Sequence, residues 1–274
     1  MTLYLIGIGL YDEKDITVRG LEIVKTCDKV FLEHYTSILG IDKQILESFY
    51  GRKVELASRD FVEKLADKQL IEASKESDIA LLIVGDVFGA TTHTDLFLRA
   101  KEKNVDVEVI FNASVMNAIG IVGLELYKYG KTTSIVFPDE GWLPHTPYDV
   151  IKQNKSSGLH TLCLLDIKVA EPSRHNLLRA SRGEPVEPMP PRFMTIKEAL
   201  EVLEKIESER KENVIKKDQI FIGIARLGHP DYQIVSGTKE ELKKIDFGKP
   251  LHSLIIPGKT HHIEDEILTQ WKSS

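Results

Sequence analysis

An apolar run followed by a glycine-flanked turn constrains this chain more than any other stretch. Residues 79–84 (Ile-Ala-Leu-Leu-Ile-Val) have the unbroken hydrophobicity of a strand that is buried in a parallel sheet. Residues 85–95 (Gly-Asp-Val-Phe-Gly-Ala-Thr-Thr-His-Thr-Asp) follow, and a helical pattern continues from Leu96. Open α/β sheets bind their ligands at such turns, where a central strand ends and a helix begins. We therefore expect the turn at 85–95 to lie at a binding site.

The residues of this turn also allow a simpler interpretation. Gly85 and Gly89 lack a Cβ, which permits unusual backbone angles and close approach of a ligand to the main chain. Thr92 and Asp95 have the spacing of a capping box, so we expect them to cap the helix. Because short Gly-Asp-x-x-Gly motifs are frequent, an ordinary capped turn explains the pattern about equally well.

The order of strand and helix patterns predicts two unequal α/β domains, 1–112 and 113–274. Strands alternate with helices in the first, which is typical of a mostly parallel sheet. In the second, the strand patterns at 219–225 and 232–236 follow each other as a hairpin, so we expect a mixed sheet. Residues 170–191 contain five prolines, and we interpret them as a long excursion that is either functional or partly mobile.

The net charge, the absence of a long apolar run and the cysteine content indicate which classes of protein the chain can belong to. The net charge of −6 disfavours a generic nucleic-acid binder, which usually has a basic excess. No apolar run reaches membrane-spanning length, and the N-terminus enters a strand pattern without a basic leader. Cys27 and Cys163 lie beside apolar residues and are expected to be buried free thiols in a reducing cytosol. We therefore expect a cytoplasmic protein that binds neither nucleic acid nor membrane directly.

Motifs for covalent or metal catalysis are missing. A dinucleotide fingerprint fails because its third glycine position holds Asp12. His261, His262 and Glu264 lack the spacing of a zinc site, so we predict no metal. A P-loop and a G-x-S-x-G elbow are also absent from the sequence. Small and polar residues at predicted strand ends remain, and they suit non-covalent binding of an adenosine-type cofactor: Leu10, Asp86, Gly89, Ser114 and Val115.

Several of the candidate residues have a plain structural explanation as well. Asp86 can stabilise its turn through a hydrogen bond to the backbone. Ser114 can cap the helix that follows the strand at 105–110, which would leave N–H groups open toward a ligand. His252 begins the last strand pattern and can be a core histidine. These alternatives stay open on the residues alone.

Seven segments in combination resemble the diphthine synthases, which are members of the tetrapyrrole-methylase-like class of methyltransferases. The resemblance covers nearly the whole chain, and the segment 158–168 looks like the eukaryotic branch. The chain departs from the family pattern at Val87, where proline is usual, and at Phe111, where histidine is common. The segments that carry the resemblance are 4–10, 35–37, 85–95, 112–120, 158–168, 191–195 and 250–254.

The resemblance implies a methyltransferase that uses S-adenosylmethionine and acts on translation elongation factor 2 in diphthamide biosynthesis. The acceptor is an amino-carboxypropyl group on a histidine, which family members methylate several times on the amine. The eukaryotic branch also esterifies a carboxylate, so we expect the type that yields diphthine methyl ester. A homodimer is implied, with the cofactor in the cleft between the two domains and no catalytic side chain assigned. The implied cofactor contacts are Leu10, Asp86, Gly89, Ser114, Val115, Leu165, Leu227 and His252.

Two other functions remain open at this point. One is a methyltransferase of the same class that acts on a tetrapyrrole precursor, and the other is a non-catalytic module that binds the elongation factor. The segments Thr-Thr-His at 91–93 and Pro-Pro-Arg-Phe-Met at 190–194 weigh against the first. Arg192 is a candidate partner for the acceptor carboxylate, and a solvated arginine is the alternative.

Overall fold

The computed structural model describes residues 1–34, 38–59, 61–169, 182–183 and 189–272 of the 274-residue chain. The segment 35–37 and most of the excursion at 170–191 therefore lie outside the described residues. The chain divides into two compact units, of which unit 1 comprises Met1–Ile119 with Gly228–Pro230. Unit 2 comprises Gly120–Leu227 with Asp231–Ser274. The domain boundary at residue 112 stays a prediction.

Unit 1 is built on a five-stranded sheet in which every neighbouring pair runs parallel. The strand order is β3-β2-β4-β1-β5, with the predicted strand before the turn, β4, at the centre and buried along its whole length. The mostly parallel sheet expected from the sequence is thus confirmed. The strands are β1 (Thr2–Gly7), β2 (Lys29–Glu33), β3 (Glu55–Ala57), β4 (Ile79–Ile83) and β5 (Asp106–Ile110).

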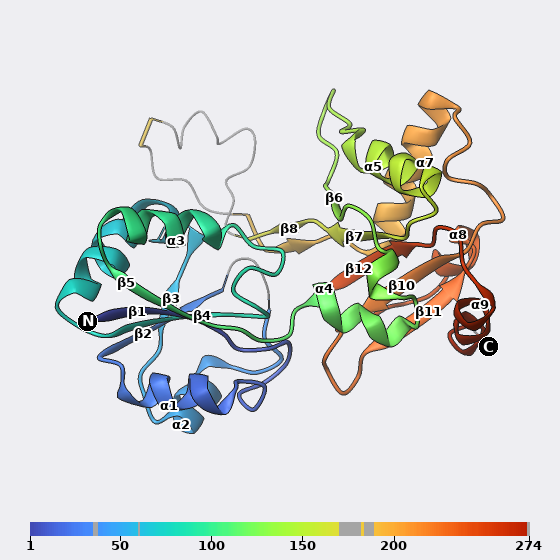
Figure 1. Ribbon diagram of the computed structural model, residues 1–274. Helices are drawn as coiled ribbons and strands as arrows, with labels where there is room; N and C mark the ends of the chain where they lie inside the picture. The colour runs from blue at the N-terminus through green and yellow to red at the C-terminus, as the bar shows by residue number, and fades with distance from the viewer. Residues whose placement is uncertain (35–37, 60, 170–181, 184–188, 273–274) are drawn as a thin grey trace. The chain divides into compact units, whose positions relative to one another are not determined.

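Helices cover both faces of this sheet, as Figure 1 shows. Alternate residues of the strands point to opposite faces, so Leu81 packs under one helical layer and Leu82 under the other. One layer contains α1 (Val18–Thr26) and α2 (Lys43–Tyr50). The opposite layer contains η1 (Phe61–Leu65), η2 (Asp67–Glu72), η3 (Ala73–Lys75) and α3 (His93–Glu102).

One local expectation in unit 1 differs from the structure, and one helical segment has an unusual form. The segment 61–75 winds as π and 3₁₀ turns with little α-helix. Thr92 does occupy the N-cap of α3, yet its hydroxyl makes no capping hydrogen bond because its backbone is not extended (φ −107°, ψ 12°). The carboxylate of Asp95 instead accepts from Arg99 Nε at 2.8 Å, so the predicted capping box is wrong.

Unit 2 contains a second five-stranded sheet, of order β11-β10-β12-β7-β6. Only the β6–β7 pair of this sheet is parallel, which confirms the expected mixed sheet and the β10–β11 hairpin. A two-stranded ribbon of β8 (Ile167–Lys168) and β9 (Arg192–Phe193) follows β7. The five strands of the sheet are β6 (Thr133–Ile135), β7 (Thr161–Leu165), β10 (Phe221–Ala225), β11 (Gln233–Gly237) and β12 (His252–Ile256).

The helices of unit 2 bury an apolar core against this sheet, with α5 (Thr146–Ser156) and α7 (Ile196–Arg210) on one face (Figure 1). Thr195 and Glu198 form the predicted capping box at the start of α7. None of the helices in the described part of the chain is both long and apolar enough to cross a membrane. The other helical turns among the described residues are α4 (Val115–Ala118), η4 (Ile119–Val122), η5 (Leu126–Lys128), α8 (Lys239–Leu242) and α9 (His262–Gln270).

Candidate functional site

The turn after β4 lies against the end of β1, as its position in the sheet requires. Gly85 donates its N–H to the carbonyl of Gly9 at 2.6 Å, and Gly9 donates to the carbonyl of Gly85 at 3.2 Å. A Cβ on Gly7 would lie only 2.7 Å from the Gly85 oxygen. The lack of side chains at these positions therefore lets two strand ends lie in backbone contact, beside Leu10.

Asp86 ties the turn to the end of β5. One carboxylate oxygen accepts from the N–H of Phe88 at 2.9 Å, and the other accepts from the N–H of Asn112 at 3.0 Å. The amide of Asn112 then donates to the carbonyl of Gly7 at 3.0 Å. Asp86 thus has the structural role that the sequence left open, because it holds the turn after β4 to the end of β5, and Asn112 extends this link to the end of β1. Its contact with a cofactor stays a prediction.

Gly89 is pressed against Ser114. A Cβ on Gly89 would lie 2.5 Å from Ser114 Oγ, so any side chain would displace the start of α4. Ser114 caps this helix, since its Oγ accepts from the N–H of Met116 at 3.2 Å, and Val115 is the first helical residue. Unit 1 therefore brings four of the predicted contacts, Asp86, Gly89, Ser114 and Val115, to one end of its sheet.

The three predicted contacts in unit 2 also share one end of a sheet. Leu165 ends β7, His252 begins β12, and Leu227 lies two residues beyond the end of β10. Because β12 runs antiparallel to both β7 and β10, its first residue lies beside the last residues of the other two. The sequence alone could not show this, because it did not give the strand order.

His252 has a buried ring nitrogen, Nδ1, that lacks a hydrogen-bond partner among the described residues. The residue is 8% exposed, and Nε2 lies 3.1 Å from the carbonyl of Lys249, which can only accept a hydrogen bond. Nε2 therefore carries the proton, and Nδ1 is an acceptor with no partner among the described residues. Burial lowers the pKa of His252, so the ring stays neutral near pH 7. Adenosyl groups carry amine and hydroxyl donors, so this buried acceptor fits such a group.

We predict a contribution of His252 to the pH dependence of stability. Since the pKa of His252 is lower in the folded chain than its usual 6.5, the unfolded chain binds this proton first. The free energy of unfolding should therefore fall as the pH drops below about 6.5. Urea unfolding at several pH values should show a shallower fall for His252→Gln than for the unaltered chain. Equal slopes would contradict the assignment of a neutral, buried ring.

A buried pair, Glu33 and His93, lies beside the same turn and was not found from the sequence. Both side chains are 1% exposed, and Oε2 lies 3.1 Å from Nε2. Nδ1 lies 3.2 Å from the carbonyl of Val87. The ring therefore touches Glu33 at one nitrogen and hydrogen-bonds to the turn at the other. The pair thus anchors the middle of the turn to the end of β2.

We expect His93→Gln to lower the free energy of unfolding by about 1–2 kcal/mol, because a shorter side chain cannot keep both the hydrogen bond to Val87 and the buried contact with Glu33. Chemical denaturation with urea would measure the change. His262→Gln is the matched control, since His262 is exposed and should change stability by less than about 0.5 kcal/mol. Equal effects of the two substitutions would show that the buried pair does not hold the turn.

A second cluster, in unit 2, surrounds the fully buried carboxylate of Glu264. Oε2 accepts from Lys128 Nζ at 2.5 Å and from the N–H of His261 at 3.1 Å. Oε1 accepts from His160 Nε2 at 3.1 Å and from the N–H of Glu125 at 3.1 Å. Burial alone would raise the pKa of Glu264, but these donors lower it to about 2. Glu264 is therefore a buried, charged carboxylate that links four hydrogen-bond donors.

Three residues of this cluster lie close enough to suggest a metal site, with ligand atoms of Glu125, His261 and Glu264 within 4.8 Å of one another. Nδ1 of His261 accepts from the N–H of Ile263 at 3.2 Å, and Nε2 lies 3.2 Å from Glu125. Nδ1 accepts and Nε2 donates, so neither ring nitrogen offers a lone pair to a metal. The arrangement favours an ion-pair and hydrogen-bond network, and the absence of a metal stays a prediction.

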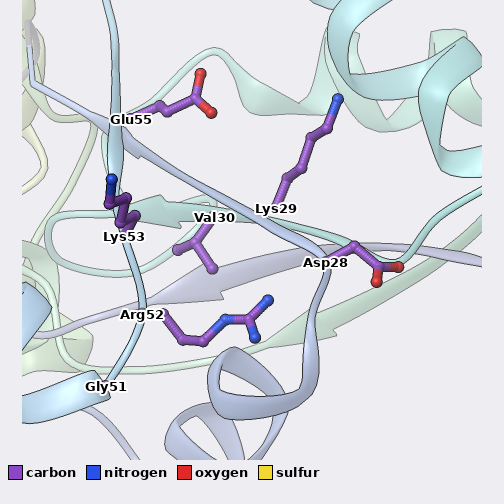
Figure 2. Close-up of a pocket in the computed structure, with 7 residues that line it drawn as sticks. All are labelled: Asp28, Lys29, Val30, Gly51, Arg52, Lys53 and Glu55. Carbon is purple, nitrogen blue, oxygen red and sulfur yellow. The ribbon is translucent and has the colours of Figure 1, made fainter.

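A cavity of about 300 Å³ lies at the other end of the first sheet. It is lined at the start of β2 by Asp28, Lys29 and Val30, and beyond α2 by residues 51–53 and Glu55 (Figure 2). Parallel sheets bind ligands at the carboxyl ends of their strands, whereas this cavity adjoins the amino ends. Its wall also mixes basic with acidic side chains, so it offers no defined charge to a ligand.

Comparison with known proteins identifies sequence and structural relatives of this chain. The sequence model of the Tetrapyrrole (Corrin/Porphyrin) Methylases matches residues 2–243. The chain is 52% identical over 268 residues to the diphthine methyl ester synthase of Dictyostelium discoideum, covering 97% of this chain and 96% of that protein. It is 48% identical over 272 residues to the human protein of that name, covering 97% and 94%. A crystal structure of diphthine synthase superposes with a TM-score of 0.82 at 35% identity, covering 99% and 96%.

Proposed function

The chain belongs to the tetrapyrrole methylase family and, within it, to the diphthine methyl ester synthases, and from this membership we propose its substrates. It is a methyltransferase of diphthamide biosynthesis. We propose that S-adenosylmethionine is its methyl donor and that translation elongation factor 2 is its acceptor. The acceptor group is the amino-carboxypropyl-modified histidine, which is methylated on the amine and also on the carboxylate.

Residues at two strand ends support the choice of cofactor. The unpartnered Nδ1 of His252 suits a donor of the adenosyl group, and the missing side chain at Gly89 lets the turn pack directly against Ser114, another predicted contact. We propose that these two residues bind the cofactor together with Leu10, Asp86, Ser114, Val115, Leu165 and Leu227. The position of the cofactor between two domains stays a prediction.

The residues of the chain need only bind the cofactor and the acceptor and align them with each other. When bound, S-adenosylmethionine supplies a methyl group that its sulfonium already activates. Hydrogen bonds from Asp86 hold the backbone turn, and Ser114 caps the helix start, so both can position one reactant without reorganising. Alignment of two reactants can contribute roughly 7–11 kcal/mol to lowering a barrier. No catalytic side chain is therefore assigned.

We further propose that the protein is a cytoplasmic homodimer that acts without binding nucleic acid or membrane directly. These proposals rest on the family resemblance and on the acidic net charge of −6. Sedimentation of the purified chain would measure the dimer.

Transfer of labelled methyl groups tests the proposed function. The chain is incubated with labelled S-adenosylmethionine and elongation factor 2 that carries the amino-carboxypropyl group. Label on the elongation factor supports the proposal. Label on a tetrapyrrole precursor alone would favour a different methyltransferase of the family, and binding of elongation factor without label would favour a non-catalytic module.

A further inference from the structure

Two cations of unit 2 lie over one aromatic ring. The β8–β9 ribbon places Lys168 directly opposite Arg192. The guanidinium carbon of Arg192 lies 3.7 Å from the centre of the Phe137 ring, and Lys168 Nζ lies 5.8 Å from the same point. Phe137 is only 4% exposed, so its ring is a fixed platform. Stacking on it holds the plane of the guanidinium group in one orientation.

The charges on this ribbon are not balanced locally. Like charges directly opposite each other on two strands destabilise the pair. Among the described residues, the one ion pair of the ribbon joins Glu198 Oε1 to Nη2 of Arg192 at 3.1 Å, and Lys168 has none. The other oxygen of Glu198 is occupied, because it accepts from the N–H of Thr195 at 2.9 Å in the capping box. The Arg192 side chain is 57% exposed, so most of its N–H donors remain available to a ligand.

The ribbon also begins beside the predicted cofactor contacts of the same unit. Lys168 is three residues beyond Leu165, so their Cα atoms lie within about 11 Å of each other. Leu165 shares its end of the sheet with Leu227 and His252, as described above. Asp166 lies between Leu165 and the β8–β9 ribbon in the sequence. Its carboxylate accepts from the N–H of Phe137 at 2.9 Å, which holds the backbone of the residue on which Arg192 stacks.

We propose that Lys168 and Arg192 form an anion subsite that binds the carboxylate of the acceptor's amino-carboxypropyl group. This inference rests on the proposed function and adds the residues that would recognise the acceptor. A planar guanidinium group binds a carboxylate through two parallel hydrogen bonds, and a nearby ammonium adds charge. Esterification removes the negative charge, so the methyl ester should lose this attraction and bind more weakly than the free acid.

The test compares binding of two forms of elongation factor 2, the free acid and its methyl ester, to the unaltered chain and to variants. We expect the unaltered chain to bind the acid at least about tenfold more tightly than the ester, and Arg192→Ala to lose this preference. Arg192→Lys should recover part of it, and Lys168→Ala should reduce it. Lys197→Ala, an exposed lysine on α7, is the control and should keep the preference. The dissociation constant for S-adenosylmethionine should stay within about twofold in every variant.

Each contrary result has a distinct meaning. If Arg192→Ala weakens acid and ester equally, the arginine binds an acidic surface of the partner and the subsite is refuted. If the variants lose cofactor affinity together with acceptor affinity, the ribbon is merely structural and the subsite is also refuted. If the unaltered chain transfers no methyl group to the elongation factor, the proposed function fails and the subsite fails with it.

Discussion

Gly89→Ala should weaken binding of S-adenosylmethionine by about tenfold. The added Cβ would lie 2.5 Å from Ser114 Oγ and 2.6 Å from Ser114 Cβ, so either the turn or the start of α4 must move. Overpacking of this kind costs about 1–3 kcal/mol, and 1.4 kcal/mol corresponds to a factor of ten in affinity. Titration calorimetry would measure the dissociation constant.

Gly120→Ala is the matched control for this substitution. A Cβ on Gly120 would meet Leu126 Cδ1 at 3.4 Å, which is an ordinary van der Waals contact. We expect its affinity for the cofactor to stay within about twofold of the unaltered chain. A thermal melt of Gly89→Ala would show that the chain is folded. Unchanged affinity in the folded Gly89→Ala variant would mean that the cofactor does not bind at this turn.

Glu264→Gln should destabilise the chain by about 3 kcal/mol, the larger of the stability effects we predict. The carboxylate is fully buried and accepts from four donors, two of them backbone N–H groups. The amide of glutamine has one oxygen that can still accept hydrogen bonds. Its NH₂ group replaces the second carboxylate oxygen, so it points a donor at groups that are themselves donors. Removing one side of a buried charge pair costs about 3–5 kcal/mol. Urea unfolding at pH 7 would measure the loss, with the exposed Glu266→Gln as control.

The same carboxylate predicts an acid-sensitive part of the stability. The pKa of Glu264 falls from its ordinary 4.5 to about 2 in the folded chain, so the unfolded chain takes up this proton first. The stabilisation is present above about pH 4.5 and disappears as the pH falls toward about 2. Glu264→Gln should therefore unfold with less dependence on pH in this range. An identical acid profile for both chains would contradict the role of Glu264.

The sequence predicted those features that depend on local pattern. The apolar run at 79–84 became the central strand β4 because a strand covered on both faces needs such residues. Thr195 and Glu198 cap α7 as expected, since a capping box depends only on residues three apart. Pattern alone was insufficient for Thr92, whose backbone does not take the extended shape that would aim its hydroxyl at the helix.

Contacts between distant segments could not be predicted from one sequence. Glu33 meets His93 because β2 and β4 are neighbours in the sheet, which the order of residues does not specify. The stacking of Arg192 on Phe137 depends in the same way on the pairing of β8 with β9. The role of Asp86 in joining strand ends was one of two alternatives that the sequence offered, and only the structure revealed its partners.

Mass analysis of the modified histidine peptide is the most direct test of the central claim. After reaction with S-adenosylmethionine, elongation factor 2 should carry several methyl groups on the amine and one on the carboxylate. Mild alkali should remove only the last, because it hydrolyses esters and leaves methylated amines intact. A peptide that gains no methyl group, or gains none that alkali removes, would contradict the assignment of this chain as a diphthine methyl ester synthase.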